Sequence, residues 1–401
     1  YDKFARKKDY RFFKNAELSK KFKNLNEKNL KGAVAYTDAM VDDSRLVLRV
    51  LQDSIDLGGY AINYTEAKEL IIKNSKVVGV KIQDKTSSTL LSLKAPTVIN
   101  ATGAWADLVR KDVCDEQKVR PLRGSHAVIP ASICPVSDVF TFLHPKDKRG
   151  VYVYPWENTV VLGTTDLDHN EELNLEPKIS NKELNYLIDG FNSQFDKVKI
   201  DREDIISTWA GVRPVIGSGK GKDPSKERRD HVVWNDNGLI TVSGGKLTTF
   251  RLIALDTLDR AKATLPKPKN IDDHAMFKTP QKTGHHIDAS NPMHSKRLLG
   301  RYGDKATKLL STVRNNEDQF IGESNYWLTE CRWAIANEAI EHIDDLMLRR
   351  TRLGMCLPDG AKNLLPRLKI LFTEERNWTD EKWNEEVVRY NQIWRDSYYI
   401  P

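Results

Sequence analysis

The sequence is poor in cysteine and has no long apolar run, and both absences narrow the class of protein. No cysteine pair has CxxC spacing, and no histidine stands at metal-ligand spacing; the four cysteines are Cys114, Cys134, Cys331 and Cys356. This distribution argues against zinc fingers, iron–sulfur clusters and a disulfide framework, and it fits a reducing compartment. No run of about 18 apolar residues is present, so we expect no membrane-spanning helix. The first residues also lack the apolar core of a signal peptide.

Glycine-rich phosphate loops of the two common kinds are absent as well. The sequence contains neither GxGxxG nor GxxxxGK followed by Ser or Thr, the patterns whose glycines bring backbone N–H groups against a phosphate. The run GSGKGK at residues 217–222 fits neither pattern, and we interpret it as a flexible loop. Hydrophobic residues make up 39% and charged residues 30% of the 401 residues. This balance excludes an intrinsically disordered chain and predicts two or three globular domains.

The positive net charge is confined to one end of the chain. Lys and Arg number 63 and Asp and Glu 56, a net charge of +7, and residues 1–31 hold 11 of the basic and 4 of the acidic side chains. The other 370 residues are therefore neutral overall, which argues against a uniformly basic nucleic-acid-binding protein. Apolar and Lys residues at helical spacing predict an amphipathic helix over residues 13–31, ending near Gly32.

The remaining pattern predicts an α/β chain followed by a purely helical part. Ser44–Ile55 predicts an amphipathic helix, and residues 61–103 predict four short strands. From about residue 117 to 204, β-prone segments and a helix over residues 181–195 indicate a largely antiparallel layer. Amphipathic helices without strands predict a separate all-α domain over residues 291–401.

Four segments carry residue types suited to ligand binding and chemistry. They are VINATGAWAD (98–107), LRGSHAVIP (122–130), WAGVRP (209–214) and SGGKLTTFR (243–251). In the first and fourth, small residues end a strand and open a helix, where backbone N–H groups can approach an anion. In the second, the side chain of His126 should point opposite to those of its neighbours. In the third, Arg213 stands among small and apolar residues and needs an anion or carboxylate partner. Taken singly, each segment also fits a structural role, such as a plain turn, a surface histidine or a buried ion pair.

Together and in this order, these segments resemble those of the flavin-dependent glycerol-3-phosphate dehydrogenases and α-glycerophosphate oxidases. The likeness runs from about residue 32 to the C-terminus and also includes GAVAYTDAMVDDSRLVL, INYTEA, LGTTD, RRDHVV and IDDLMLRRTRLGM. It implies a glutathione-reductase-like FAD domain, an antiparallel-sheet substrate domain and a C-terminal all-α domain. The expected divisions are a basic helical segment of the cap region (1–31), an FAD-domain portion (32–116), an antiparallel substrate-binding domain (117–205), the FAD-domain return with the substrate pocket (206–263), a linker (264–290) and the helical domain (291–401).

The resemblance also implies an activity and a set of site residues. In that family FAD takes a hydride from C2 of sn-glycerol 3-phosphate, which yields dihydroxyacetone phosphate, and the electrons pass to quinone or oxygen. On this likeness His126 is the expected general base, and Arg213 binds the substrate and stabilises the forming carbonyl. Arg229 and Lys246 are expected around the phosphate, and no metal is expected. The residues expected at FAD are Ala67, Ala101, Thr102, Gly103, Gly244, Gly245, Leu247 and Thr248.

One departure from the family and two alternatives stay open. FAD enzymes of this fold begin with a βαβ unit that carries GxGxxG. We therefore expect that unit to lie before Tyr1, and this chain alone to bind FAD weakly or not at all. A related flavin-dependent amine or hydroxy-acid oxidase would need a carboxylate-binding arginine but no phosphate cluster. A cofactor-free fragment that acts as a binding module is the second alternative.

The resemblance gives expectations for location and partners too. It implies a cytoplasmic protein with no nucleic-acid partner, and it allows a homodimer. It also allows peripheral contact with the cytoplasmic face of the inner membrane. The basic segment 1–31 then either rests on anionic lipid or forms a solvated face, and the sequence leaves both open.

Overall fold

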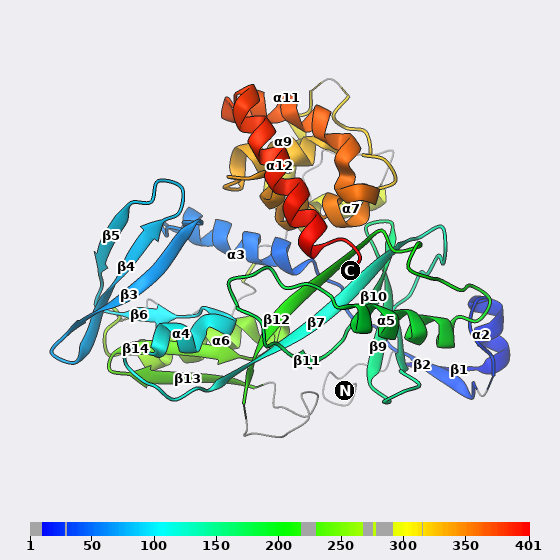
Figure 1. Ribbon diagram of the computed structural model, residues 1–401, viewed down its shortest axis with the longest axis horizontal. Helices are drawn as coiled ribbons and strands as arrows, with labels where there is room; N and C mark the ends of the chain where they lie inside the picture. The colour runs from blue at the N-terminus through cyan, green and yellow to red at the C-terminus, as the bar shows by residue number, and fades with distance from the viewer. Residues whose placement is uncertain (1–9, 29, 218–229, 268–275, 278–291, 315) are drawn as a thin grey trace.

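A computed structural model describes residues 10–28, 30–217, 230–267, 276–277, 292–314 and 316–401. Figure 1 shows β-sheets in the lower part of the molecule and a group of helices from the C-terminal part above them. Between the two lies α3 (Asp43–Asp56), the helix expected over Ser44–Ile55. Its N-terminus is capped by Asp42, whose side chain accepts from the backbone N–H of Arg45, so an N-cap residue sets where the helix begins.

A small sheet brings two of the motif-bearing strands side by side. Strands β6 (Val98–Asn100) and β14 (Leu239–Gly244) are parallel neighbours, and β13 (His231–Asp236) pairs antiparallel with β14. Each parallel strand runs into helical turns: β6 into η1 and α4, and β14 into η3 and α6. Their bounds are Gly103–Trp105, Ala106–Arg110, Leu247–Thr249 and Phe250–Ala261. Because parallel neighbours end at the same edge, both strand-to-helix turns lie at one edge of this sheet.

Next to this sheet stands an antiparallel meander. It consists of β3 (Thr65–Lys73), β4 (Lys76–Asp84) and β5 (Leu90–Lys94). Leu70 of β3 and Val77 of β4 pack against Leu239 of β14, so the two sheets share a small apolar core. With β6, these strands confirm the four predicted between residues 61 and 103.

The larger sheet is antiparallel, as the sequence predicts for this region. It comprises β7 (Val119–Pro130), β8 (Phe140–Leu143), β9 (Gly150–Trp156), β10 (Thr159–Gly163), β11 (Leu167–Asp168) and β12 (Ser207–Ile216), in the order β11-β7-β10-β9-β8 with β12 also on β7. Helix α5 (Asn181–Gln194) covers one face and packs Leu184 and Phe191 on buried Ala127 and Leu162. The candidate site lies on the opposite face of β7.

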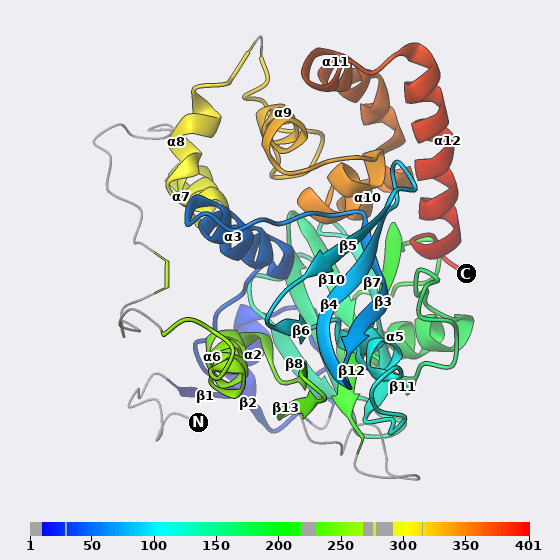
Figure 2. The ribbon, with the colours of Figure 1, turned by 90° about the vertical axis from the view of Figure 1, so that its left-hand side faces the viewer.

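The helical part follows the predicted all-α pattern. Its helices are α7 (Pro292–Tyr302), α8 (Lys305–Leu310), α9 (Leu328–Asn337), η4 (Asp345–Arg350), α10 (Leu353–Cys356), η5 (Pro358–Leu364), α11 (Leu365–Arg376) and α12 (Asp380–Ser397). In the described part from residue 292 onward, the only β pairing is one isolated bridge between Phe320 and Trp327. We call this part the helical tail. It lies over α3 and the ends of β7, β10 and β12 (Figure 1, Figure 2).

The N-terminal segment differs from its prediction. The helix expected over residues 13–31 is reduced to α2 (Asn15–Lys21), preceded by β1 (Arg11–Lys14). Strand β1 pairs antiparallel with β2 (Gly32–Ala35), so the Phe12 and Phe13 positions follow a strand rather than a helix. Beyond α2 the chain leaves helical geometry, and the side-chain amide of Asn26 donates to the carbonyl oxygen of Ser193 instead. Long-range pairing therefore overrides the local helical spacing.

The structure differs from one expected domain division and does not describe most of the expected linker. Strand β12 begins after the division expected at residue 205, yet it pairs with β7 of the antiparallel sheet, so that sheet extends past the expected division. Most of the expected linker, residues 264–290, lies outside the described residues. The domain limits therefore stay predictions. In the described part of the chain, no helix has both the length and the apolar character needed to cross a bilayer.

Candidate active site

The turn after β6 is built around a buried asparagine. The Asn100 side chain donates from Nδ2 to the carbonyl oxygen of Ala106 at 2.9 Å, and its Oδ1 accepts from the Thr102 hydroxyl at 2.7 Å. Asn100 is 2% exposed, so these bonds form away from water and fix the turn through Ala101, Thr102 and Gly103. The sequence pointed to the turn but not to the asparagine that holds it.

The turn after β14 depends on a glycine. Gly245 has a φ of +88°, and a side chain there would also overlap Ile253 of α6. This left-handed residue after Gly244 leads the chain from β14 into η3, where Lys246, Leu247 and Thr248 are exposed. The two turns lie at the same edge because β6 and β14 are parallel, so the structure brings together the two segments expected at FAD.

A cavity lies beside the first of these turns. It has a volume of about 510 Å³ and is lined by Ala67 of β3, Thr102, Trp105 of η1, and Leu108 and Val109 of α4, among others. Ala67 and Thr102 were both expected at FAD, from separate motifs. Their meeting in one cavity, beside a turn of small residues at a helix start, fits a nucleotide.

His126 lies on the face of β7 opposite α5. Its cross-strand partners are Trp209 of β12 and Gly163 of β10. The imidazole stacks on the Trp209 ring with centroids 4.8 Å apart and planes 14° apart. On the other side, a Cβ at Gly163 would collide with the imidazole, so the missing side chain makes room for it. The ring is thus held between two neighbouring strands.

The electrostatic surroundings keep His126 neutral. Burial, followed by the nearby charge of Arg213, lowers the pKa of His126 to about 3. Its Nδ1 is buried and has no hydrogen-bond partner in the described structure. The imidazole is therefore unprotonated at neutral pH, the state that a proton acceptor requires.

Arg213 lies on the same face, four residues after Trp209 along β12. Its guanidinium donates from Nη2 to the Thr164 hydroxyl at 3.0 Å, and its Nη1 lies 3.5 Å from Asp166 Oδ1. A Cβ at Gly124 would overlap the guanidinium, so that glycine gives it space. About a third of the side chain (37%) stays exposed, so the cation can still meet a ligand from solvent.

Strand β12 connects this cation to the nucleotide edge. Pro214, next to Arg213, approaches the Cβ position of Gly103 to 3.9 Å, and Ile216 lies 3.0 Å from the Cβ position of Gly244. The strand therefore lies against both turns. Lys246 stands at the start of η3 near this edge, whereas Arg229 is outside the described residues.

Sequence reasoning missed the residues that shape the site. Gly124, Gly163 and Trp209 act across strands, so their roles depend on the register of the sheet. Thr164 and Asp166 belong to LGTTD, which carried the family likeness but no assigned role. The only signal for them in the sequence was their place in that motif.

The two turns lie at the ends of adjacent parallel strands, beside the antiparallel sheet that carries His126 and Arg213. Comparison with known families gives the class of this protein, the FAD-dependent oxidoreductases. The family model described as FAD dependent oxidoreductase matches residues 1–251. The model described as the C-terminal domain of alpha-glycerophosphate oxidase matches residues 273–383. Together the two models cover most of the α/β part and most of the helical tail.

Curated relatives indicate which group of this family the chain belongs to. The aerobic glycerol-3-phosphate dehydrogenase of Bacillus subtilis is 29% identical over 399 residues, which cover 93% of this chain and 71% of the relative. That of Staphylococcus saprophyticus is 31% identical over 383 residues, with 88% and 68% covered. The chain belongs to the FAD-dependent oxidoreductase family, in the group of the glycerol-3-phosphate dehydrogenases and α-glycerophosphate oxidases.

Solved structures agree in fold. The glycerol-3-phosphate dehydrogenase of Bacillus halodurans, complexed with FAD, has a TM-score of 0.79 at 24% identity and covers 96% of this chain and 78% of its own. The L-α-glycerophosphate oxidase of Mycoplasma pneumoniae, with FAD bound, has a TM-score of 0.51 at 17% identity, with 65% and 67% covered. The expected fold class and the expected cofactor, FAD, are confirmed for the family.

Proposed function

We propose that this protein oxidises sn-glycerol 3-phosphate to dihydroxyacetone phosphate. The observation that carries the proposal is the pairing of a neutral imidazole, His126, with a partly exposed guanidinium, Arg213, on one sheet face beside the nucleotide edge. A base for the C2 hydroxyl proton and a cation for the developing oxyanion are what this oxidation needs. The names of the relatives support the choice of substrate.

FAD supplies the hydride acceptor when it is bound. The residues that would hold it are Ala67 and Ala101 to Gly103 on one side, and Gly244, Gly245, Leu247 and Thr248 on the other. The fit rests on the cavity beside Thr102 and on the two turns at one sheet edge. Helix starts at both turns favour negative charge, as the pyrophosphate and a reduced flavin require.

The residues of the chain divide the remaining work. His126 accepts the proton of the C2 hydroxyl, and Arg213 binds the oxygen on which negative charge develops. Because Arg213 disfavours a charged imidazole, an anion bound to Arg213 offsets this effect and raises the proton affinity of His126. Substrate binding would thus make the base stronger when it is needed. Lys246 and Arg229 are proposed at the phosphate.

The electron acceptor, membrane contact and homodimer stay predictions. An anionic phosphate on the substrate separates the proposal from the amine and hydroxy-acid oxidase alternative. The FAD-loaded protein should reduce a dye acceptor with glycerol 3-phosphate and give no comparable rate with amino acids or 2-hydroxy acids. A faster rate with either alternative substrate would overturn the proposal. The absence of any turnover in the FAD-loaded protein would favour the binding-module alternative.

A further inference from the structure

The orientation of His126 poses a physical question. An imidazole in a site is usually oriented by a hydrogen bond to one of its two ring nitrogens. Nδ1 of His126 is buried without a hydrogen-bond partner in the described structure, so no bond at that atom fixes the ring. What remains around the ring is packing: the Trp209 indole on one side and the bare Cα of Gly163 on the other.

The indole of Trp209 is itself supported from the helical tail. Trp156, at the end of β9, lies against Trp209 with ring centroids 5.6 Å apart at 58°. Both indoles pack against the apolar core of the tail. The guanidinium of Arg352 lies over the Trp156 ring, 5.6 Å from its centroid, within the range of a cation–π contact. A continuous series of contacts thus leads from Arg352 to His126.

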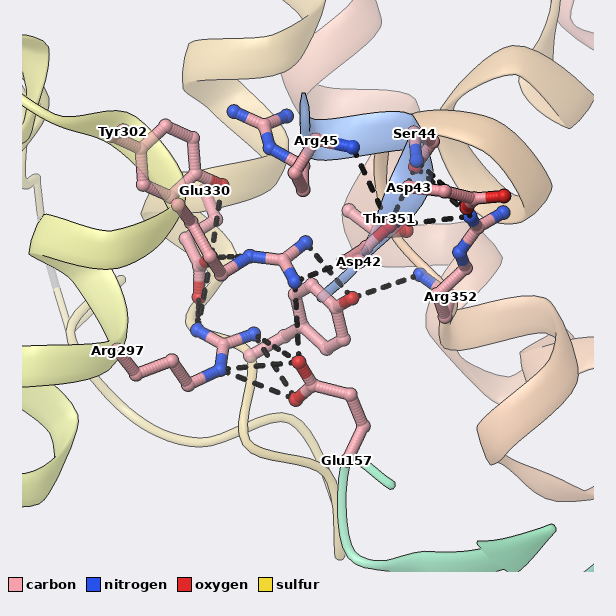
Figure 3. Close-up of polar contacts among 12 residues, drawn as sticks. Asp42, Asp43, Ser44, Arg45, Glu157, Arg297, Tyr302, Glu330, Thr351 and Arg352 are labelled. Carbon is pink, nitrogen blue, oxygen red and sulfur yellow. Dashed lines mark hydrogen bonds and ion pairs between the residues drawn. The ribbon is translucent and has the colours of Figure 1, made fainter. Parts of the chain in front are cut away.

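Arg352 is fixed by polar contacts at its other edge. Its Nη2 donates to Ser44 Oγ at 2.9 Å and pairs with Asp42 at 3.3 Å and Asp43 at 3.2 Å, all at the start of α3 (Figure 3). Asp42 also pairs with Arg301 of α7 at 3.0 Å. Burial would raise the pKa of Asp42, but Arg301 and Arg352 outweigh it and lower the pKa to about 2. The cluster therefore stays ionised at neutral pH.

The tail also binds the strand that carries Trp209. The Ser207 hydroxyl donates to the carbonyl oxygen of Met355 at 2.6 Å. The backbone N–H of Thr208 donates to the carbonyl oxygen of Tyr398 at 2.8 Å, and its hydroxyl donates to that of Tyr399 at 3.0 Å. The residues just before Trp209 are thus hydrogen-bonded to the tail.

We propose that Arg352, Trp156 and Trp209 are positioning residues for His126, so that the helical tail sets the orientation of the catalytic base. This inference rests on the proposed role of His126. It assigns the tail a task in the reaction, through contacts that join its IDDLMLRRTRLGM motif to WAGVRP and RGSHAVIP.

The test compares Arg352→Met with a matched control, Arg332→Met. Arg332 is also a tail arginine, with a buried ion pair to Glu317 and more exposed ones to Glu374 and Glu375. All three lie within the tail and involve neither indole. In the FAD-loaded protein, Arg352→Met and Trp209→Ala should lower kcat for glycerol 3-phosphate about 10-fold or more while KM changes little. Trp209→Phe keeps an aromatic face and should restore most of kcat.

A second readout needs neither FAD nor substrate. In protein with 13C at histidine Cε1, the His126 resonance is identified by its loss in His126→Asn. Arg213 lies near the ring in every variant, and Tyr152 of β9 stays the cross-strand partner of Gly163, so these groups are constant. In the parent and in Trp209→Phe the resonance should not titrate between about pH 5 and 8. In Trp209→Ala and Arg352→Met it should, because water reaches the ring.

The outcomes separate the two proposals. Equal losses of kcat in Arg352→Met and Arg332→Met, with an unchanged His126 resonance, would overturn the positioning role and leave the tail a stabilising one. A fully active His126→Asn would instead overturn the proposed base. If Arg352→Met does not fold, Trp156→Leu interrupts the same series of contacts from the sheet side and carries the same expectations.

Discussion

At the scale of the residue, the candidate site depends on two glycines, because a larger side chain at either position would occupy space that the site needs. Gly163 and Gly124 leave the space that the His126 ring and the Arg213 guanidinium occupy. The two positions differ in what an added Cβ would meet. At Gly163 it meets a ring already packed on Trp209, and at Gly124 it meets the end of a flexible chain that can move aside.

Gly163→Ala should therefore damage catalysis. The added Cβ displaces the imidazole, so kcat should fall about 100-fold, the lower range of the contribution of a general base. The free energy of unfolding should also fall by about 1–3 kcal/mol through overpacking. Gly150→Ala, at the start of β9 in the same sheet, meets no atom within 4 Å and should change neither quantity. Steady-state kinetics and urea denaturation measure both, and equal effects in the two variants would contradict the role of Gly163.

Gly124→Ala should act on binding instead. Since the guanidinium of Arg213 can shift, the free energy of unfolding should change by less than about 1 kcal/mol. The shift withdraws the guanidinium from its hydrogen bond to Thr164, so KM for glycerol 3-phosphate should rise about 10-fold or more. An unchanged KM, with kcat reduced, would show that Arg213 does not bind the substrate in the ground state.

The low pKa of His126 makes a prediction for stability against pH. The folded chain keeps this histidine neutral down to about pH 3, whereas in the unfolded chain it gains a proton near its ordinary pKa of about 6.5. The unfolded state therefore binds more protons between these values, and stability falls as the pH is lowered through that range, by at most about 1.4 kcal/mol per pH unit. Urea denaturation from about pH 6.5 to 4.5 should show a smaller slope of stability against pH for His126→Asn than for the parent, which carries the same carboxylates. Identical slopes would contradict the burial of a neutral imidazole.

At the scale of the element, α5 anchors the site from behind. Glu183 accepts hydrogen bonds from the hydroxyls of Ser125 (2.8 Å), Thr165 (2.7 Å) and Ser180 (2.7 Å) and pairs with Arg123 at 2.9 Å. Ser125 precedes His126, and Thr165 stands between the two residues that hold Arg213. Through this carboxylate, the first turn of one helix fixes the backbone next to His126 and the segment whose Thr164 and Asp166 contact the Arg213 guanidinium.

Glu183→Ala should be strongly destabilising. It leaves Arg123 with only its exposed partner, Glu171, and leaves the buried hydroxyls without their acceptor, so the free energy of unfolding should fall by about 3 kcal/mol or more. Glu171→Ala removes the other, exposed partner of Arg123 and should cost less than about 1 kcal/mol. Urea denaturation of both variants tests the difference, and similar costs would mean that Glu183 is not the anchor.

The elements also show what the sequence could and could not predict. Helices α3 and α5 were predicted to within one residue from the pattern of their own segments. In the structure their starts are also fixed locally, because Asp42 and Ser180 accept from backbone N–H groups there. The segment over residues 13–31 has helical spacing too, but pairing of Phe13 with Ala33 makes its start a strand. A cap acts locally and can be read locally, whereas strand pairing depends on distant residues.

At the scale of the whole molecule, two motifs that are far apart in the sequence lie in contact, one at the start of α3 and one in the helical tail. YTDAMVDDSRLVL supplies Asp42 and Arg45 at the start of α3, and the tail supplies Arg301, Glu338 and Arg352 to pair with them. The order of the motifs predicted the proposed base and the substrate arginine, because the segments together match a family pattern. It could not predict that the tail contacts both α3 and β12, since the partners stand about 150 to 310 residues apart.

Asp42 makes the contact between α3 and the helical tail sensitive to acid. Its folded pKa of about 2 lies below the ordinary 3.8 because Arg301 and Arg352 outweigh its burial. A carboxyl with a depressed pKa contributes stability above its unfolded pKa and loses it as the pH falls toward the folded value, which amounts to about 2 kcal/mol here.

Asp42→Asn should therefore be less stable than the parent at neutral pH, because it leaves the guanidinium groups of Arg301 and Arg352 with fewer partners. It should also lose less stability than the parent on acidification. Asp43→Asn, whose side chain is 72% exposed, should follow the parent protein at each pH. Urea denaturation at about pH 7 and pH 3 gives the comparison. If Asp42→Asn lost as much stability as the parent between these values, the acid-sensitive group would lie elsewhere in the protein.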